Sequence, residues 1–294
     1  MMHRRSCLDS VSQILARIFL LLSVMMALLL LVGLVVKSRP ILMQVSLWEL
    51  FTGDSWRPLK GEFGFFPFII STVVVTLIAL LLAVPPCLLA AIYLSEYSST
   101  RLQQSFRPIL EVLAAIPSVI YGLWGVLVIV PLTRTIGGWL GYANSGYTLI
   151  AGGMVLAVMV VPFIISLSME VLLAVPAEAR LTALALGCTR WETTRHVVVR
   201  HAQRGFFAAV LLGFSRAFGE TIAVMMVIGN VAKTPRSLFD PAYTLPALIA
   251  NNYGEMMSIP LYDSAIMLAA LILMVIIIAV NLIAHRILGK LEVR

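Results

Sequence analysis

Residues 66–94 read FPFIISTVVVTLIALLLAVPPCLLAAIYL and contain no Asp, Glu, Lys or Arg. About 20 consecutive apolar residues in a helix are enough to cross the ~30 Å hydrocarbon core of a membrane. Lipid offers no hydrogen-bond partner to an open backbone, and the stretch lacks the alternation of period two that is typical of barrel strands. It therefore predicts a membrane-spanning α-helix, and it indicates a membrane protein of the all-α class.

Five other stretches have the same character. The six predicted spans are Ile18–Val36, Phe66–Leu94, Val112–Pro131, Tyr147–Ala174, Phe206–Val231 and Ser264–Ala284. The composition agrees, since 61% of the 294 residues are hydrophobic and 12% are charged, whereas about 25% are charged in ordinary soluble domains. We therefore expect a six-helix transmembrane domain at residues 18–294, preceded by a short cytoplasmic segment at residues 1–17.

The basic residues are distributed unequally between the two ends of these spans. With the N-terminus in the cytoplasm, thirteen Lys and Arg residues fall on the cytoplasmic side and seven on the outer side. The positive-inside rule favours this orientation, which places both termini in the cytoplasm. The net charge of +7 follows from the same bias, so it gives no reason to expect a nucleic-acid partner.

Arg216 and Glu220 are charged residues inside the fifth predicted span. An isolated charge at the centre of a membrane helix costs about 2.5–3.5 kcal/mol on insertion scales, so such residues need partners and often mark a transport path. Their spacing of i and i+4 would place them on one helix face, where they could form an ion pair. Two interpretations remain open: a purely structural ion pair that lets the helix insert, or a pair that lines a pathway for an anion, which a planar guanidinium binds well.

The predicted cytoplasmic segment at about 175–205 has a helical composition. Pro176 is suited to the first turn of a helix, Leu181, Leu184 and Ala185 share one face at helical spacing, and Gly187 with Thr189 can end that helix before a second one begins near Trp191. An amphipathic helix of this kind can lie on anionic lipid or can dock a partner protein. Periodicity alone leaves these two interpretations equally open.

Four strings carry a resemblance to a known family. Residues 184–194 read LALGCTRWETT, and the other three are FFPFII at 65–70 leading to AIYLSEY at 91–97, AAIPSVIYGLWG at 114–125, and SRAFGETIAV at 215–224. The first string resembles the coupling loop of ABC-importer permeases, and together the strings resemble the permeases of bacterial phosphate importers. The string at 114–125 is more similar to the C-type permease subunit of those importers than to its A-type partner. The match covers most of the chain from Phe63 to Asn230.

The resemblance implies a type I ABC-importer permease fold, also called MetI-like, in the bacterial inner membrane. It implies that Arg216 and Glu220 lie on the phosphate pathway. It also implies that the coupling loop docks the ATPase, and the candidate docking residues are Glu178, Leu181, Ala183, Leu184, Gly187 and Trp191. Aligned on Gly187, the Glu-Ala-Ala of the family falls on Leu181-Thr182-Ala183 and its Leu-Pro falls on Val199-Arg200, so this loop departs from the family pattern at both places.

No Gly-x-x-x-x-Gly-Lys-Ser/Thr sequence is present, so the chain has no motif that would bind the phosphates of ATP. We therefore expect a transport subunit and not an enzyme, without catalytic residues, metal ligands or cofactors. The resemblance implies three partner proteins, namely an ATPase dimer, a second permease that makes a heterodimer and a periplasmic phosphate-binding protein, and the apolar spans imply the lipid bilayer. Two alternatives remain: a permease of the same fold for another oxyanion or small solute, and an ion-coupled secondary carrier, although no inverted repeat is evident.

Overall fold

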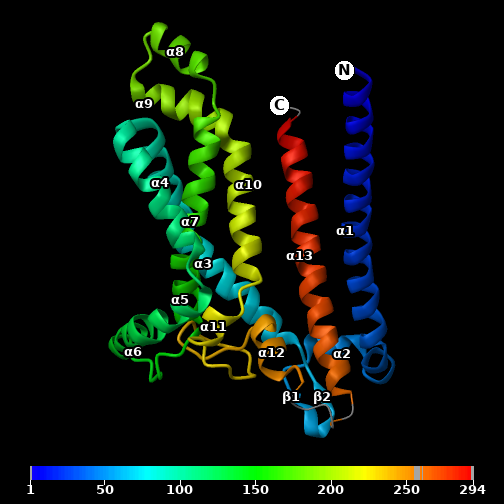
Figure 1. The fold of residues 1–294 in the computed structure, drawn as a ribbon. Coiled ribbons are helices and arrows are strands. Elements are labelled where there is room, and N and C mark those ends of the chain that lie inside the picture. Colours follow the sequence, from blue (N-terminus) through cyan, green and yellow to red (C-terminus); the bar gives the residue numbers. More distant parts are fainter. Residues whose placement is uncertain (1, 255–258, 260, 293–294) are drawn as a thin grey trace.

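The computed structural model describes residues 2–254, 259 and 261–292, and they form an elongated helical bundle (Figure 1). The α-helices are α1 (Met2–Gln44), α2 (Leu47–Thr52), α3 (Phe66–Ile92), α4 (Thr100–Ala115), α5 (Ser118–Trp124), α6 (Val130–Trp139), α7 (Leu149–Leu173), α8 (Ala177–Ala185), α9 (Arg190–Glu192), α10 (Val199–Phe218), α11 (Ile222–Met225), α12 (Leu245–Asn252) and α13 (Tyr262–Glu292). Three π-helical segments continue α3, α5 and α9, namely η2 (Tyr93–Tyr97), η3 (Gly125–Ile129) and η4 (Thr193–Val198). A 3₁₀ turn, η1 (Pro58–Lys60), links the antiparallel strands β1 (Trp56–Arg57) and β2 (Glu62–Phe63).

Six helical segments are long and apolar enough to cross a membrane among the residues described, which confirms the predicted number of spans. They are Gln13–Gln44, Phe66–Tyr97, Ser118–Trp139, Leu149–Leu173, Arg190–Phe218 and Tyr262–Ile287. The all-α class is also confirmed, and the chain is a multi-pass membrane protein.

Several predicted span boundaries differ from those of the structure, and two of the differences have a clear local cause. The third span begins at Ser118 and not at Val112, because Pro117 has no N–H to continue α4 and holds Ile116 in an extended conformation with ψ 129°. The fifth span ends at Phe218 and not at Val231, because Gly219 caps α10 and the chain leaves the helix before α11. Two interruptions of helical structure are therefore present where hydropathy alone indicates continuous helices.

The main core lies where α7 packs between α3 and α10. Small residues allow the backbones to approach closely, as is common between membrane helices. A Cβ on Gly153 would lie 2.4 Å from Ile78 Cγ2 of α3, and one on Gly213 of α10 would lie 2.8 Å from Ile164 Cγ1 of α7. The three helices are thus fixed to one another by contacts that leave no room for larger side chains.

A second core joins the segment before α3 to the segment after α11. Phe65 and Phe68 at the start of α3 are buried with Leu245 of α12 and Tyr243. Thr72 reinforces this contact, because its hydroxyl accepts a hydrogen bond from the backbone N–H of Leu245 at 2.9 Å. These two segments therefore form a packed cap at one end of the bundle.

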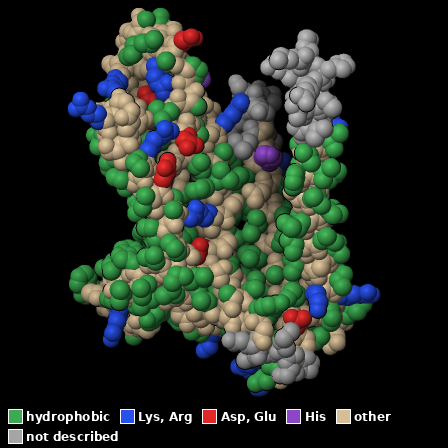
Figure 2. Space-filling view, viewed as in Figure 1, with side chains coloured by type: hydrophobic (Ala, Val, Ile, Leu, Met, Phe, Trp, Pro, Cys, Tyr) green, Lys and Arg blue, Asp and Glu red, His purple; other side chains and the backbone are tan. Residues whose placement is uncertain are grey.

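The two ends of the bundle differ in what they carry. One end holds α8 and α9, and α1 begins and α13 ends at this same end, whereas β1, β2, α2 and α12 lie at the opposite end (Figure 1). Figure 2 shows basic side chains gathered over the lobe that contains α8 and α9, with hydrophobic side chains along the length of the bundle. Helix α1 packs beside α13, and no residue of its apolar window is buried within the chain, as suits a helix in lipid.

Candidate functional site

Two interruptions of helical structure lie next to each other in the bundle. Ile116 and Pro117 separate α4 from α5, and Gly219–Thr221 separate α10 from α11. Helices α5 and α11 contact each other closely, because a Cβ on Gly122 would lie 3.1 Å from Cα of Ala223. Non-helical backbone at membrane depth is tolerated where protein covers it or where it lines a cavity that contains water.

Arg216 lies at this junction, two residues before the end of α10. Its Nη2 donates a hydrogen bond to the carbonyl of Ala114 at 3.1 Å, in the last turn of α4. Its guanidinium carbon lies 5.3 Å from the centre of the Phe163 ring on α7. The carbonyl end of a helix and the face of an aromatic ring both attract a cation. The Arg216 side chain is otherwise exposed.

Glu220 lies in the link after α10 and is half-buried. Its Oε1 accepts a hydrogen bond from the backbone N–H of Ala223 at 3.3 Å, which caps α11. The prediction that Arg216 and Glu220 share one helix is wrong, because α10 ends between them. Among the residues described, ion pairs within 4.0 Å join Arg57 to Glu62 and Arg180 to Glu96, so neither pair contains Arg216 or Glu220.

Tyr121 supports the same junction, and the sequence analysis missed it. This buried side chain donates a hydrogen bond from its hydroxyl to the carbonyl of Leu113 at 2.7 Å. Tyr121 and Arg216 thus bind adjacent carbonyls in the last turn of α4, where the usual N–H partners four residues on are missing. The carbonyl of Leu113 also accepts a hydrogen bond from the N–H of Ile116 at 3.3 Å. The signal was available in part, since Pro117 predicts a break in the helix and the freed carbonyls need donors.

The junction presents a guanidinium with spare hydrogen-bonding capacity. Arginine has five N–H donors, and one of them is used by the carbonyl of Ala114. Because an exposed charge on a membrane helix is costly in lipid, this surface requires water, another protein chain or an anion against it. The arrangement is therefore suited to binding an oxyanion through the remaining donors.

The predicted coupling loop forms the two helices that were expected. Pro176 caps α8, Gly187 follows it with a φ of +88°, and α9 begins after Thr189. Thr189 and Glu192 form a capping box, in which each side chain binds the backbone N–H of the other residue. The loop is therefore a defined helix, turn and helix that projects from the end of the bundle (Figure 1).

An exposed apolar patch covers this loop, and we define it by four large side chains. Its members, with their exposed fractions, are Leu181 (65%), Leu184 (46%), Leu186 (81%) and Trp191 (59%). Of the other predicted docking residues, Glu178 is exposed in the first turn of α8, and Ala183 is buried. Exposed apolar groups that lie together are typical of surfaces that bind protein or membrane.

An ion pair fixes the loop to the rest of the bundle, and the sequence analysis did not predict it. Arg180 of α8 binds both carboxylate oxygens of Glu96 in η2, with Nη2 to Oε1 at 2.7 Å and Nε to Oε2 at 3.2 Å. Arg180 also donates to the carbonyl of Leu172, in the last turn of α7, and to that of Val175, two residues beyond its end. The side chains of Arg180 and Glu96 are 23% and 10% exposed.

A second arginine strengthens the attachment. Arg190 of α9 donates a hydrogen bond to the backbone carbonyl of Glu96, and its guanidinium carbon lies 5.1 Å from the centre of the Tyr97 ring. Tyr97 in turn donates to the hydroxyl of Thr194 at 3.4 Å. The loop, the end of α3 and the end of α7 are thus joined into one unit, because both arginines bind Glu96.

Comparisons with known proteins agree with this geometry. The profile of the family described as "Binding-protein-dependent transport system inner membrane component" matches residues 87–292. The chain is 36% identical over 262 residues to a phosphate transport system permease protein PstC of Mesorhizobium japonicum, covering 84% of this chain and 80% of the relative. It is 37% identical over 259 residues to the PstC of Xylella fastidiosa, covering 83% and 79%.

A solved structure is similar in fold. A chain of the MetNI methionine ABC transporter, in an inward-facing conformation, matches with a TM-score of 0.59 and 19% sequence identity. The match covers 76% of this chain and 94% of that chain. At this identity the likeness bears on the fold alone.

Proposed function

We propose that this chain, which belongs to the family of binding-protein-dependent transport system inner membrane components, is a permease subunit of an ATP-driven phosphate importer. Its relatives of 36% and 37% identity are phosphate transport permeases, and they cover most of its length. The proposal makes the chain a transport subunit whose energy comes from a separate ATPase.

The observation that carries the proposal is the exposed guanidinium of Arg216 between two interrupted membrane helices. Broken helices at membrane depth are common at the substrate sites of transporters, where helix ends and freed backbone groups face the substrate. In our proposal, Arg216 binds phosphate through the donors that Ala114 leaves free. Glu220 holds α11 in place beside the path and limits the approach of anions by its negative charge.

The proposed pathway runs along the surface of the chain that carries Arg216. A charge that is exposed in the single subunit would be unstable against lipid, so we infer that a second permease covers this surface and completes the path. A heterodimer is expected, by analogy with the two permease types of the resembling importers.

The coupling loop provides the proposed contact with the ATPase. The apolar patch at Leu181, Leu184, Leu186 and Trp191 supplies the surface for docking. Movement of the loop would pass to α3 and α7 through Arg180 and Glu96, because this ion pair joins the loop to the ends of both helices. Helix α10, which carries Arg216, follows directly from the loop through η4, so rigid-body movement of the loop is suited to opening and closing the path.

This role defines the proposed orientation. The end with α8 and α9, where α1 begins and α13 ends, faces the cytoplasm, as the excess of basic residues favours. The opposite end faces the periplasm and receives phosphate from a secreted binding protein. The bilayer in question is the bacterial inner membrane.

The test is uptake of labelled phosphate by vesicles that contain the chain with its candidate ATPase, second permease and binding protein. We expect uptake that requires ATP and all four components. We also expect that sulfate, molybdate and phosphonate do not compete with labelled phosphate. Transport of another solute in place of phosphate would overturn the substrate assignment. Transport by the purified chain without ATPase would instead identify an ion-coupled carrier.

A further inference from the structure

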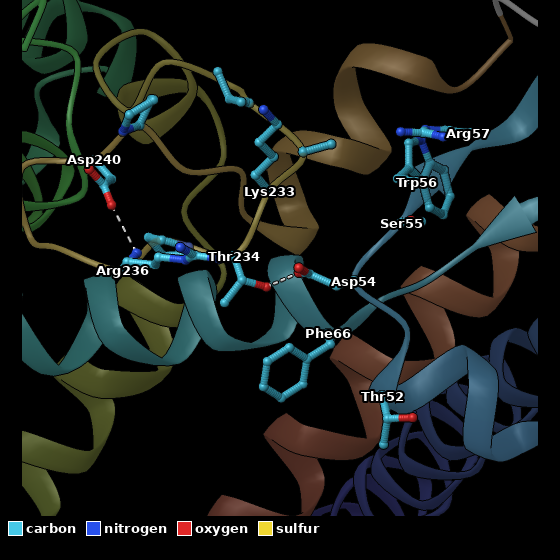
Figure 3. Close-up of a pocket in the computed structure, with 14 residues that line it drawn as sticks. Thr52, Asp54, Ser55, Trp56, Arg57, Phe66, Lys233, Thr234, Arg236 and Asp240 are labelled. Carbon is cyan, nitrogen blue, oxygen red and sulfur yellow. Dashed lines mark hydrogen bonds between the residues drawn. The ribbon is translucent and has the colours of Figure 1, made fainter.

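A large pocket lies at the end of the molecule opposite to the coupling loop. It has a volume of about 810 Å³, and its walls come from the segment 52–57 with Phe66 and from the loop 231–241 (Figure 3). Figure 3 shows Arg57 on the wall formed by β1, with Lys233 and Arg236 on the loop. Residues far apart in the sequence thus bring three basic side chains to one recess.

The two carboxylates of this pocket are already engaged within the chain. Asp54 accepts a hydrogen bond from the hydroxyl of Thr234, which ties the two walls together. Asp240 accepts from the backbone N–H groups of Arg236 at 2.9 Å and Ser237 at 2.8 Å, which closes a turn in the loop. Both carboxylates therefore fix the shape of the pocket.

The three basic side chains are much less engaged. Within the described part of the chain, the side chains of Lys233 and Arg236 belong to neither of the ion pairs found within 4.0 Å. Arg57 approaches Glu62 at 4.0 Å, and these side chains are 62% and 40% exposed, so water weakens that contact. The two carboxylates thus hold the walls of the pocket in place, whereas the three basic side chains remain available to a ligand.

A second recess lies next to the pocket. This recess has a volume of about 340 Å³ and shares Val231 and Pro241 with the pocket. Its other lining residues include Met225 and Met226, at the end of α11. The second recess thus lies beside the pocket at the C-terminal end of α11, a helix that begins two residues after Glu220.

We propose that Arg57, Lys233 and Arg236 form an outer binding site for an inorganic oxyanion such as phosphate, which holds the anion before it reaches Arg216. The site rests on the proposed function, since its place on the periplasmic side follows from the orientation given above. A guanidinium binds an oxyanion through two parallel hydrogen bonds and an ammonium adds a mobile point charge, so the three side chains are suited to an anion with several acceptor oxygens. Basic groups gathered in a recess also raise the local concentration of an anionic substrate.

The test is protection of arginine side chains from phenylglyoxal, measured by peptide mass spectrometry on the chain in lipid nanodiscs. The reaction is followed in sodium phosphate and in sodium chloride of equal ionic strength. We expect phosphate to slow modification of Arg57 and Arg236. Arg134 is the control, because it is exposed on α6 and does not line the pocket, and we expect its rate to be unchanged.

Two matched variants sharpen the result. Lys233→Gln removes a basic group from the pocket, whereas Lys60→Gln removes one from the neighbouring turn outside it. Losing one charge-assisted hydrogen bond weakens binding about tenfold, so the phosphate concentration that half-protects Arg236 should rise about tenfold in Lys233→Gln. It should stay unchanged in Lys60→Gln.

Equal rates in phosphate and chloride, or equal protection of Arg134, would overturn the site. Protection that appears only when the secreted binding protein is added would also overturn it, and would identify the pocket as a protein-docking surface. Because protection is measured without ATP or transport, it separates this site from the proposed function. Uptake with no protection rejects the outer site alone, and protection without uptake rejects the transport role alone.

Discussion

Arg180 and Arg216 lie in the same bundle and are bound in opposite ways. Arg180 has a carboxylate on two of its nitrogens, two further carbonyl acceptors and a side chain that is only 23% exposed. Arg216 has one carbonyl at 3.1 Å, one aromatic ring and an exposed side chain. The fold provides a carboxylate and two carbonyls as acceptors for Arg180, whereas it leaves most hydrogen-bond donors of Arg216 free. We infer that the first holds structure and transmits movement, and that the second binds the transported ion.

The largest effect that this comparison predicts is on Arg216. Replacing it with Gln in the assembled transporter should reduce phosphate uptake by at least ~100-fold, because two charge-assisted hydrogen bonds at about 1.5–3 kcal/mol each are lost. Assembly with the ATPase and the thermal stability should stay unchanged, since the fold gives Arg216 few contacts. The measurement is uptake of labelled phosphate by reconstituted vesicles.

Arg286→Gln is the matched control for that experiment. Arg286 is also exposed and lies on a membrane-spanning helix, α13, away from the junction. We expect uptake close to that of the unmodified protein. Normal uptake by Arg216→Gln would contradict the inference that Arg216, unlike Arg180, binds the transported ion.

The next largest effect is on stability at Arg180. Arg180→Gln leaves the carboxylate of Glu96 mostly buried and without its charged partner, which should lower the free energy of unfolding by about 3 kcal/mol. In the double variant Glu96→Gln with Arg180→Gln no buried charge is left, so we expect about half of the loss to be recovered. The measurement is thermal unfolding in detergent.

Arg57 and Glu62 provide the contrast for this pair. They lie 4.0 Å apart and are largely exposed, so Arg57→Gln should cost less than about 1 kcal/mol. If Arg180→Gln and Arg57→Gln proved equally mild, Arg180 would not be a structural arginine, and the contrast with Arg216 would lose its basis.

The sequence predicted the six spans and Arg216 for physical reasons. Hydropathy over about 20 residues is a strong signal, so the six spans were found. Arg216 was found because a charge in an apolar span is rare and costly. Helix ends within the membrane give a weaker signal, because Gly219 and Pro117 are compatible both with a break and with a continuous helix that is locally bent.

The ion pair between Arg180 and Glu96 could not be predicted by the same reasoning. The two residues are 84 positions apart. Glu96 follows a predicted span and Arg180 lies in the predicted cytoplasmic segment, and at both places a solvated charge is the ordinary expectation. Only the packing of α3 against α7 brings them together. The three basic residues of the outer pocket were missed for the same reason, since Arg57 and Arg236 meet through tertiary structure alone.

A smaller effect is expected at the apolar patch of the coupling loop. Exposed tryptophans are frequent anchors of protein interfaces, and truncating an anchor typically costs more than about 1 kcal/mol. Trp191→Ala should therefore weaken co-purification of the ATPase about tenfold while leaving thermal stability unchanged. Trp139→Ala is the control, because Trp139 is 84% exposed on α6 and lies outside the coupling loop. Equal losses in the two variants would show that Trp191 has no specific role in docking.

The smallest predicted effect separates backbone geometry from packing within that loop. Gly187 has a φ of +88°, and Gly138 lies within α6; a Cβ on either would meet nothing within 4 Å. Since neither site is crowded, only the backbone conformation distinguishes them. Gly187→Ala should destabilise the loop by about 1 kcal/mol, because a left-handed conformation is strained for residues with a Cβ. Gly138→Ala should be neutral or stabilise by up to about 1 kcal/mol, because Ala favours a helix.

Hydrogen exchange of the amides in α8 and α6 measures both changes. Stability changes of opposite sign in the two variants would show that the turn before α9 is held in one backbone geometry, which a loop that passes movement to Arg180 requires. Changes of equal sign would remove this argument for a rigid coupling loop.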